Sequence, residues 1–419
     1  MPLTIPTMDA HVRPEENPMP HSSPNLYSAD SVRARVEAAL RGERTDRLPF
    51  IGRLELWQRG LVRTGKLPAE FTGRSLNEIH RAVGFGRQQF LSPYSTRLRG
   101  VEVIVTQEER VIHQEHEPLV ERFPDTDQFV PGDRPGLTRT TFKTPVGDLV
   151  VEHTLNRQMI DDGVRSYTSK HPILCDDDYA PAIYILERME IVPQLARLTE
   201  RRAHFGDFGF VVPSIERIPF QQLLIDYFVT TDFFYALHDA HAQVTTLMAL
   251  LDAKLEAAIR LLAADDGPYI QIGDNLDGDM TNPRLFRHYC LPVYQRYADL
   301  IHAQGKRMGS HTDGNLKALL PLLAESGLDV CESFSPAPLT PVTVADALAV
   351  WQPKPVIWGG IPSPLLEERT PVEKLDAYLE ELGQVIGERV LILNVVDMVL
   401  PNNDIERIRR IARWVGQTA

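Results

Sequence analysis

The chain has 419 residues, of which 43% are hydrophobic and 24% are charged, and its formal net charge is -13. This composition is typical of globular proteins and excludes disordered and collagen-like chains. The acidic charge also argues against nucleic acid as a partner, because such a surface repels the phosphate backbone.

The cysteines and the apolar runs indicate where the protein works. Cys175, Cys290 and Cys331 are far apart and odd in number, so we expect free thiols and a cytoplasmic location. No apolar run approaches the roughly 20 residues of a membrane-spanning helix, so no membrane partner is expected. Residues 1–30 are rich in Pro and polar residues and lack the apolar core of a signal peptide. We expect them to form an extended arm that packs on the body or on the second subunit of a homodimer.

Ordered structure is predicted to begin at residue 31. The first helix has Ser31 as its N-cap and ends near Gly42. LPFIGRLELW at 48–57 predicts a buried strand followed by a turn into a helix. Alternating stretches with turns at Pro-Gly and Val-Gly-Asp predict antiparallel hairpins at about 98–155. Because helical patterns lie on both sides of these hairpins, we interpret them as an insertion in a larger fold.

The second half alternates strands with helices. After a helix predicted at 177–202, apolar strands are expected at 207–214, 268–274, 306–311, 328–334, 354–361 and 389–396. Helices between successive strands require parallel βαβ units. No Gly-rich dinucleotide fingerprint follows the first strand, which disfavours an open doubly wound sheet. The sequence therefore predicts a single α/β domain over 31–419, a closed (β/α)8 TIM barrel.

Polar residues, mostly acidic, follow the predicted strands. In a (β/α)8 barrel the functional residues collect at the carboxyl ends of the strands, so these residues are candidates for the site. They are Arg53, Glu55, Ser214, Glu216, Arg217, Asp274, Asn275, Asp277, His311, Asp313, Glu332, Ser335, Asn394 and Asp397.

His311 and Asp313 give the sharpest local signal. Positions i and i+2 of an extended segment point the same way, so both side chains could aim at one point above the barrel. Imidazole and carboxylate suit Zn²⁺ or another first-row ion, and Glu332 or Asp397 could complete three protein ligands. The alternative is that Asp313 belongs to a turn before the next helix, and that His311 only hydrogen-bonds the substrate.

Three further residues have two interpretations each. Asp274 and Asn275 could handle substrate or protons, or they could simply cap the loop that follows their strand. Arg53 could bind a substrate carboxylate through its guanidinium fork, or it could pair with an acidic neighbour such as Glu55. Glu332 faces the barrel mouth if its neighbour Cys331 faces the helices.

Three segments together resemble the uroporphyrinogen decarboxylase superfamily. RVEAALRGERTDRLPF resembles its first helix and strand, and LNVVDMVLPNNDIERIRRIARWV resembles its closing strand and helix. The segment at 282–332, from NPRLFRHYC to LDVCE, resembles its long helix, its histidine-bearing strand and the next βα unit. The resemblance covers most of residues 31–419. It implies a (β/α)8 barrel with its site at the carboxyl ends of the strands.

The resemblance implies two chemistries, cofactor-free decarboxylation of a tetrapyrrole or zinc-dependent methyl transfer to or from a corrinoid protein or a thiol. Gly52-Arg53 resembles the end of the decarboxylase's arginine-rich motif, but the preceding arginine is missing. The essential aspartate of that family has no clear counterpart in 84–100, and the rim is acidic, so tetrapyrrole decarboxylation is not expected. Zinc methyltransferases carry His-x-Cys and a late Cys, where this chain has His311-Thr312-Asp313 and Asp397.

The main hypothesis is therefore metal-assisted methyl transfer from a small methoxylated or methylamine substrate to a corrinoid protein. A divalent metal, expected to be zinc, would be held by His311, Asp313 and Asp397. His311 and Asp274 would be catalytic, and the substrate would contact the three residues Arg53, Asn275 and Glu332. One alternative is a cofactor-free decarboxylase or lyase acting on a small carboxylic acid, with Arg53 on the carboxylate and Asp274 or His311 on the proton. Another is a non-catalytic binding protein on the same fold.

Overall fold

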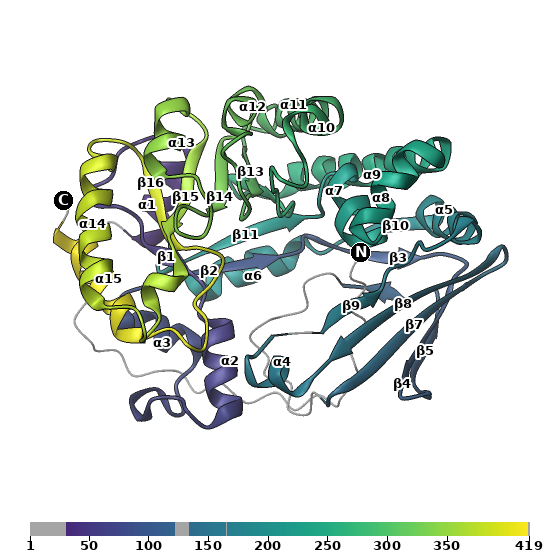
Figure 1. Cartoon of the computed structure of the whole chain (residues 1–419), viewed down its shortest axis with the longest axis horizontal. Helices are drawn as coiled ribbons and strands as arrows, with labels where there is room; N and C mark the ends of the chain where they lie inside the picture. Colours follow the sequence, from purple (N-terminus) through teal and green to yellow (C-terminus); the bar gives the residue numbers. More distant parts are fainter. Residues whose placement is uncertain (1–30, 122–133, 165, 418–419) are drawn as a thin grey trace.

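The computed structural model describes residues 31–121, 134–164 and 166–417 (Figure 1). Eight parallel strands form one sheet in the order β1-β2-β11-β12-β13-β14-β15-β16. A parallel bridge between Phe50 and Leu393 joins the two outer strands, so the sheet is nearly closed into a barrel, as predicted. The strands are β1 (Ile51–Gly52), β2 (Gly86–Leu91), β11 (Gly209–Ile215), β12 (Tyr269–Ile272), β13 (Arg307–His311), β14 (Val330–Phe334), β15 (Val356–Ile361) and β16 (Leu391–Val395).

Helices surround this sheet and connect its strands. The longer ones are α2 (Glu55–Thr64), α3 (Leu76–Val83), α6 (Leu195–Phe205), α8 (Thr230–Asp239), α9 (His241–Leu261), α11 (Leu291–His302), α14 (Val372–Ile386) and α15 (Ile405–Gln417). The shorter ones are α4 (Arg157–Asp161), α7 (Pro219–Gln222), α10 (Pro283–Leu285), α12 (Leu320–Glu325) and α13 (Val344–Val350). No helix in the described residues combines the length and the apolar character that crossing a membrane requires.

An antiparallel sheet lies between β2 and β11 along the chain. Its strand order is β5-β4-β7-β8-β9, and helix α5 (Tyr179–Arg188) packs against β7 and β8. The strands are β4 (Glu102–Gln107), β5 (Arg110–His116), β7 (Gly136–Thr144), β8 (Gly147–Leu155) and β9 (Tyr167–Lys170), so pairing extends beyond the expected 98–155. The arm expected at 1–30 lies outside the described residues.

The prediction of one continuous helix at 177–202 is wrong in the middle of that range. The chain forms strand β10 (Met189–Pro193) between α5 and α6. This strand pairs antiparallel with β3 (Tyr94–Leu98), which also pairs with the short β6 (Leu119–Val120). A partner strand almost a hundred residues earlier in the chain therefore overrides the local helical pattern.

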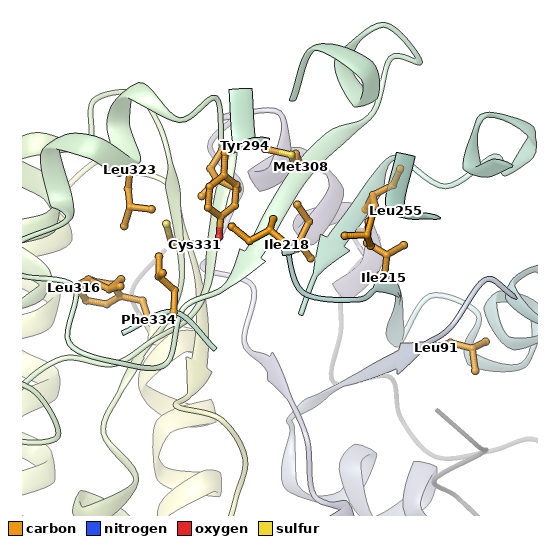
Figure 2. Packing of buried hydrophobic residues seen from close by; sticks show 14 of the residues in the cluster. Leu91, Ile215, Ile218, Leu255, Tyr294, Met308, Leu316, Leu323, Cys331 and Phe334 are labelled. Carbon is orange, nitrogen blue, oxygen red and sulfur yellow. The ribbon is translucent and has the colours of Figure 1, made fainter. Parts of the chain in front are cut away.

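Apolar side chains form two cores, one on each side of the barrel wall. The outer core lies between strands and helices, and Figure 2 shows part of it, with Met308 from β13, Cys331 from β14 and Tyr294 from α11. The inner core fills the barrel with Ile51, Phe210, Val212, Tyr269, Val330, Val356, Trp358 and Ile392. Helix α1 (Val32–Leu40) adds Val32, Val36, Ala39 and Leu40 to this inner core. Its Arg33 amide donates to Asp207 just before β11, so α1 covers the amino-terminal end of the barrel.

The tight inner core makes Gly309 sensitive to substitution. A Cβ at this position would overlap the hydroxyl of Tyr269, which is fully buried and donates a hydrogen bond to Gln271. We expect Gly309→Ala to lower the free energy of unfolding by about 1–3 kcal/mol, the usual cost of overpacking a core, as measured by urea denaturation. Gly416→Ala is the matched control, because a Cβ there meets open space. Equal stability of the two variants would contradict this packing.

Candidate active site

Five buried polar side chains from five strands meet inside the barrel. They are Gln88 of β2, Gln271 of β12, His311 of β13, Glu332 of β14 and Asn394 of β16. They occupy inward positions towards the carboxyl ends of their strands, above the apolar inner core. Polar side chains in such a place must satisfy one another, because burial removes the water that would otherwise bind them.

Glu332 is the centre of this network. Its Oε1 accepts from Gln88 Nε2 at 3.0 Å, and its Oε2 accepts from His311 Nδ1 at 2.5 Å and from Gln271 Nε2 at 3.4 Å. Asn394 Nδ2 in turn donates to Gln88 Oε1 at 3.3 Å. The register of the sheet pairs His311 directly with Glu332, so strand pairing itself brings the imidazole to the carboxylate.

His311 is positively charged at neutral pH. Burial opposes the charge, but Glu332 and Asp313 outweigh burial and raise the pKa of His311 to about 10. Its Nε2 lies 3.5 Å from Asp313 Oδ2. Burial would raise the pKa of Asp313, but its interactions with His311 lower it to about 2. The imidazolium is thus held between two carboxylates, with Nδ1 directed to Glu332 and Nε2 towards Asp313.

Arg53 lies at the end of β1 and is bound to the loop after β16. Its Nε and Nη2 donate to the backbone oxygen of Asp397, and Nη2 also donates to Asp397 Oδ1 at 2.6 Å. The guanidinium lies over the ring of Phe90, 4.8 Å from its centroid, and Phe90 makes an edge contact with His311. The acidic partner of Arg53 is therefore Asp397, and not the sequence neighbour Glu55.

Asp274 lies on the other side of the barrel wall from His311. It accepts hydrogen bonds from Ser310 Oγ at 2.9 Å, from the Ile218 amide at 2.7 Å and from the hydroxyl of Tyr294 on α11. Ser310 and His311 are consecutive in β13 and so point to opposite faces. Burial raises the pKa of Asp274, although its three donors oppose that shift. These contacts anchor the wall, and the geometry does not support the predicted catalytic role.

Asn275 is engaged by two charged side chains. Its Oδ1 accepts from Arg217 Nη2 at 2.6 Å, and its Nδ2 donates to Asp313 Oδ2 at 2.9 Å. Glu332, with no exposed surface, also has both oxygens engaged. Each polar side-chain atom of Asn275 and Glu332 thus already has a partner in the protein, so a substrate that binds these residues has to share them with that partner.

The backbone is strained at three points around this end of the barrel. Asn275, Ser333 and Asp397 have φ angles of 52°, 61° and 58°, in the left-handed region that non-glycine residues seldom adopt. The Asp397 amide donates to Ser333 Oγ at 2.9 Å, which ties two of these points together. Such strain persists only where the surrounding structure enforces it, and it is concentrated at functional sites.

Three of the residues in this region were not predicted as site residues. Gln88 and Phe90 lie on β2, a strand that the sequence pattern did not show, and Gln271 lies inside an expected strand. Glu216, directly after β11, was noted only as a strand-end residue. Burial raises its pKa to about 7, so it can exchange a proton near neutral pH.

The expected metal ligands do not assemble into a complete metal site. Zinc sites use at least three protein ligands, but the two ring nitrogens of His311 face different carboxylates, and Asp397 is paired with Arg53. Across residues 31–121, 134–164 and 166–417, no group of three or more His, Cys, Asp or Glu could hold a metal ion. The side chains as they stand do not fit the predicted site of His311, Asp313 and Asp397.

The charge on His311 makes stability depend on pH. Its pKa is about 10 in the folded protein against an ordinary value of 6.5, so its stabilising contribution is complete below 6.5 and is lost as pH rises towards 10. We expect the free energy of unfolding to fall over this range, by at most about 1.4 kcal/mol per pH unit from this group. In Glu332→Gln one of the two charges that hold the proton is gone, so the slope becomes shallower.

Urea denaturation at several pH values measures these slopes. Glu380→Gln removes an exposed carboxylate on α14 and should keep the wild-type slope. A Glu332→Gln slope equal to that of the wild type would show that Glu332 does not maintain the charge.

Parts of the chain are similar to known proteins. Residues 224–417 match the family model of uroporphyrinogen decarboxylase (URO-D). A methyltransferase from Methanosarcina mazei has a similar structure, with a TM-score of 0.54 and 14% identity over 93% of this chain and 99% of that chain. A Listeria monocytogenes structure named as a vitamin-B12-independent methionine synthase gives a TM-score of 0.28 and 15% identity over 59% of this chain and 71% of that chain. The sequence has no significant match among the curated proteins. Residues 224–417, just under half of the chain, are therefore similar to the uroporphyrinogen decarboxylase family.

Proposed function

We propose that this barrel enzyme removes a methyl group from a small methoxylated or methylamine compound, with His311 as the general acid. One observation carries the proposal, the imidazolium held between Glu332 and Asp313 at the carboxyl end of the barrel. Glu332 fixes the ring through Nδ1, which leaves the Nε2–H, on the side of Asp313, as the proton that a substrate can take. A proton donor in a fixed position typically accelerates a reaction by 10²–10⁴-fold.

The chemistry needs such a donor because an oxygen anion is a poor leaving group. When the O–CH3 bond breaks, its electron pair stays on oxygen, which takes the Nε2 proton of His311, and His311 regains a proton from water. The pKa of about 10 for His311 is close to the value of a phenol, so transfer to a phenolate costs little free energy. In the methyltransferases that the sequence resembles, a corrinoid protein supplies the nucleophile that accepts the methyl group.

The charges around His311 favour a neutral or cationic substrate. Arg53 is paired with Asp397, and Arg217 is paired with Asp226. His311 faces two carboxylates, so the group around it has a net negative charge. A methoxy compound or a methylamine enters such a site without repulsion, whereas a carboxylic acid has to displace an existing partner.

A second candidate is decarboxylation or lyase chemistry on a small carboxylic acid. It is favoured by Arg53, whose Nη1 makes no hydrogen bond among the described residues, while the guanidinium lies over Phe90 beside His311. A carboxylate on Nη1 would lie near the proton donor. When its bond to carbon breaks, CO₂ leaves, the electron pair stays on carbon, and that carbon takes the proton of His311.

Methyl transfer can be tested with a panel of methoxylated aromatic compounds and methylamines. The acceptor is free cobalamin in its reduced form, and its methylation is followed by absorbance. We expect turnover by the wild type and a 10²–10⁴-fold lower kcat in His311→Gln, because the proton donor is lost. His204→Gln, at the exposed end of α6, is the matched control and should retain activity.

Two outcomes would contradict this proposal. An unchanged kcat in His311→Gln would show that His311 is not the general acid. Release of CO₂ from carboxylic acids without methyl transfer would favour the second candidate. Elemental analysis of the purified protein, with and without His311→Ala, tests the metal prediction separately. The corrinoid partner, the homodimer and the cytoplasmic location stay predictions.

A further inference from the structure

We infer that Arg217 and Asn275 are positioning residues, which fix Asp313 and through it the Nε2 side of His311. The inference rests on the proposed role of His311 as the proton donor. Contacts between side chains run without a gap from the loop after β11 to β13, through Arg217, Asn275 and Asp313 to His311.

Arg217 is the fixed end of this chain. Its Nη1 lies 3.1 and 3.2 Å from the two carboxylate oxygens of Asp226, and its Nη2 donates to Asn275 Oδ1 at 2.6 Å. The Arg217 and Asp226 side chains are 14% and 9% exposed, so water competes little for this pair. A guanidinium held by a carboxylate has a defined plane and therefore offers Asn275 a donor in a fixed direction.

The two neighbours of Asn275 leave its amide a single orientation. A guanidinium can only donate hydrogen bonds, and an ionised carboxylate can only accept them. The amide oxygen must therefore face Arg217 and the NH2 group must face Asp313, as observed. A flipped amide would lose both bonds at once. Asn275 thus transmits the position of Arg217 to Asp313 Oδ2, the oxygen that faces His311 Nε2.

The backbone holds the same geometry independently. The amide of Leu276 donates to the carbonyl of His311 at 3.1 Å, and the amide of Gly314 donates to the carbonyl of Leu276 at 3.2 Å. The loop that carries Asn275 is therefore attached to the residues on both sides of Asp313. The left-handed φ of 52° at Asn275 is part of this arrangement, and asparagine tolerates it better than most residues do.

Asn275→Gly tests the inference, because glycine adopts a positive φ without strain and the change removes only the amide. Full-length protein labelled with ¹⁵N at histidine gives the ring N–H signals of His311, which His311→Gln identifies by their loss. We expect the Nε2–H to exchange with water at least 10-fold faster in Asn275→Gly, and the Nδ1–H on Glu332 to stay unchanged. Asn315→Ala is the control, because its amide contacts Asp279 and not Asp313, and both signals should persist.

Arg217→Lys is the second variant and decides the question if Asn275→Gly does not fold. Lysine keeps a positive charge beside Asp226 but cannot direct two fixed donors to Asp226 and Asn275, so the same selective loss is expected. An unchanged Nε2–H in a folded variant, or equal loss of both ring signals, would overturn the positioning role. These signals need no substrate, so the methyl-transfer proposal can fail while this inference holds.

Discussion

The carboxylate of Glu332 is the constraint on which the rest of the site depends. An ionised carboxylate inside a barrel costs several kcal/mol unless charge and hydrogen bonds compensate for it. Here the compensation comes from the imidazolium of His311 and from the amides of Gln88 and Gln271. The attraction between Glu332 and His311 fixes the imidazole ring and keeps it charged. Both the stability of the barrel interior and the chemistry at the barrel mouth therefore depend on this one ion pair.

The barrel itself could be predicted from the sequence because its signal is repeated. Apolar strands alternate with amphipathic helices from residue 207 onward, and each unit supports the others. Strand β2 (Gly86–Leu91) could not be recognised in this way, because Gln88 and Gln89 interrupt its apolar pattern. Gln88 is polar because it binds Glu332, so the contact that matters for the site is also what obscures the strand.

The sequence could predict which residues lie near one another in the site, but not which side-chain atoms contact each other. The prediction that His311, Asp313, Asn275 and Glu332 lie close together is correct, because each lies near the carboxyl end of a strand or after it, and parallel strands end at the same edge of the sheet. The sequence could not show that the side chains of Asp274 and Asn275 point in different directions. Asp274 points into the outer wall of the barrel, and Asn275 points to Asp313. That separation depends on a left-handed backbone angle in one loop. Nor could residue types show which ring nitrogen faces which carboxylate, and this decides whether a metal can bind.

The position of helix α1 has a consequence for how reactants travel. Within the described residues, α1 closes one end of the barrel, and Phe210, Tyr269 and Trp358 fill its middle. A passage through the barrel is therefore blocked, and whatever reaches His311 has to arrive and depart at the opposite end. If the enzyme transfers methyl groups, the methyl donor and the methyl acceptor must both reach the site from that end of the barrel. They therefore bind either one after the other or next to each other.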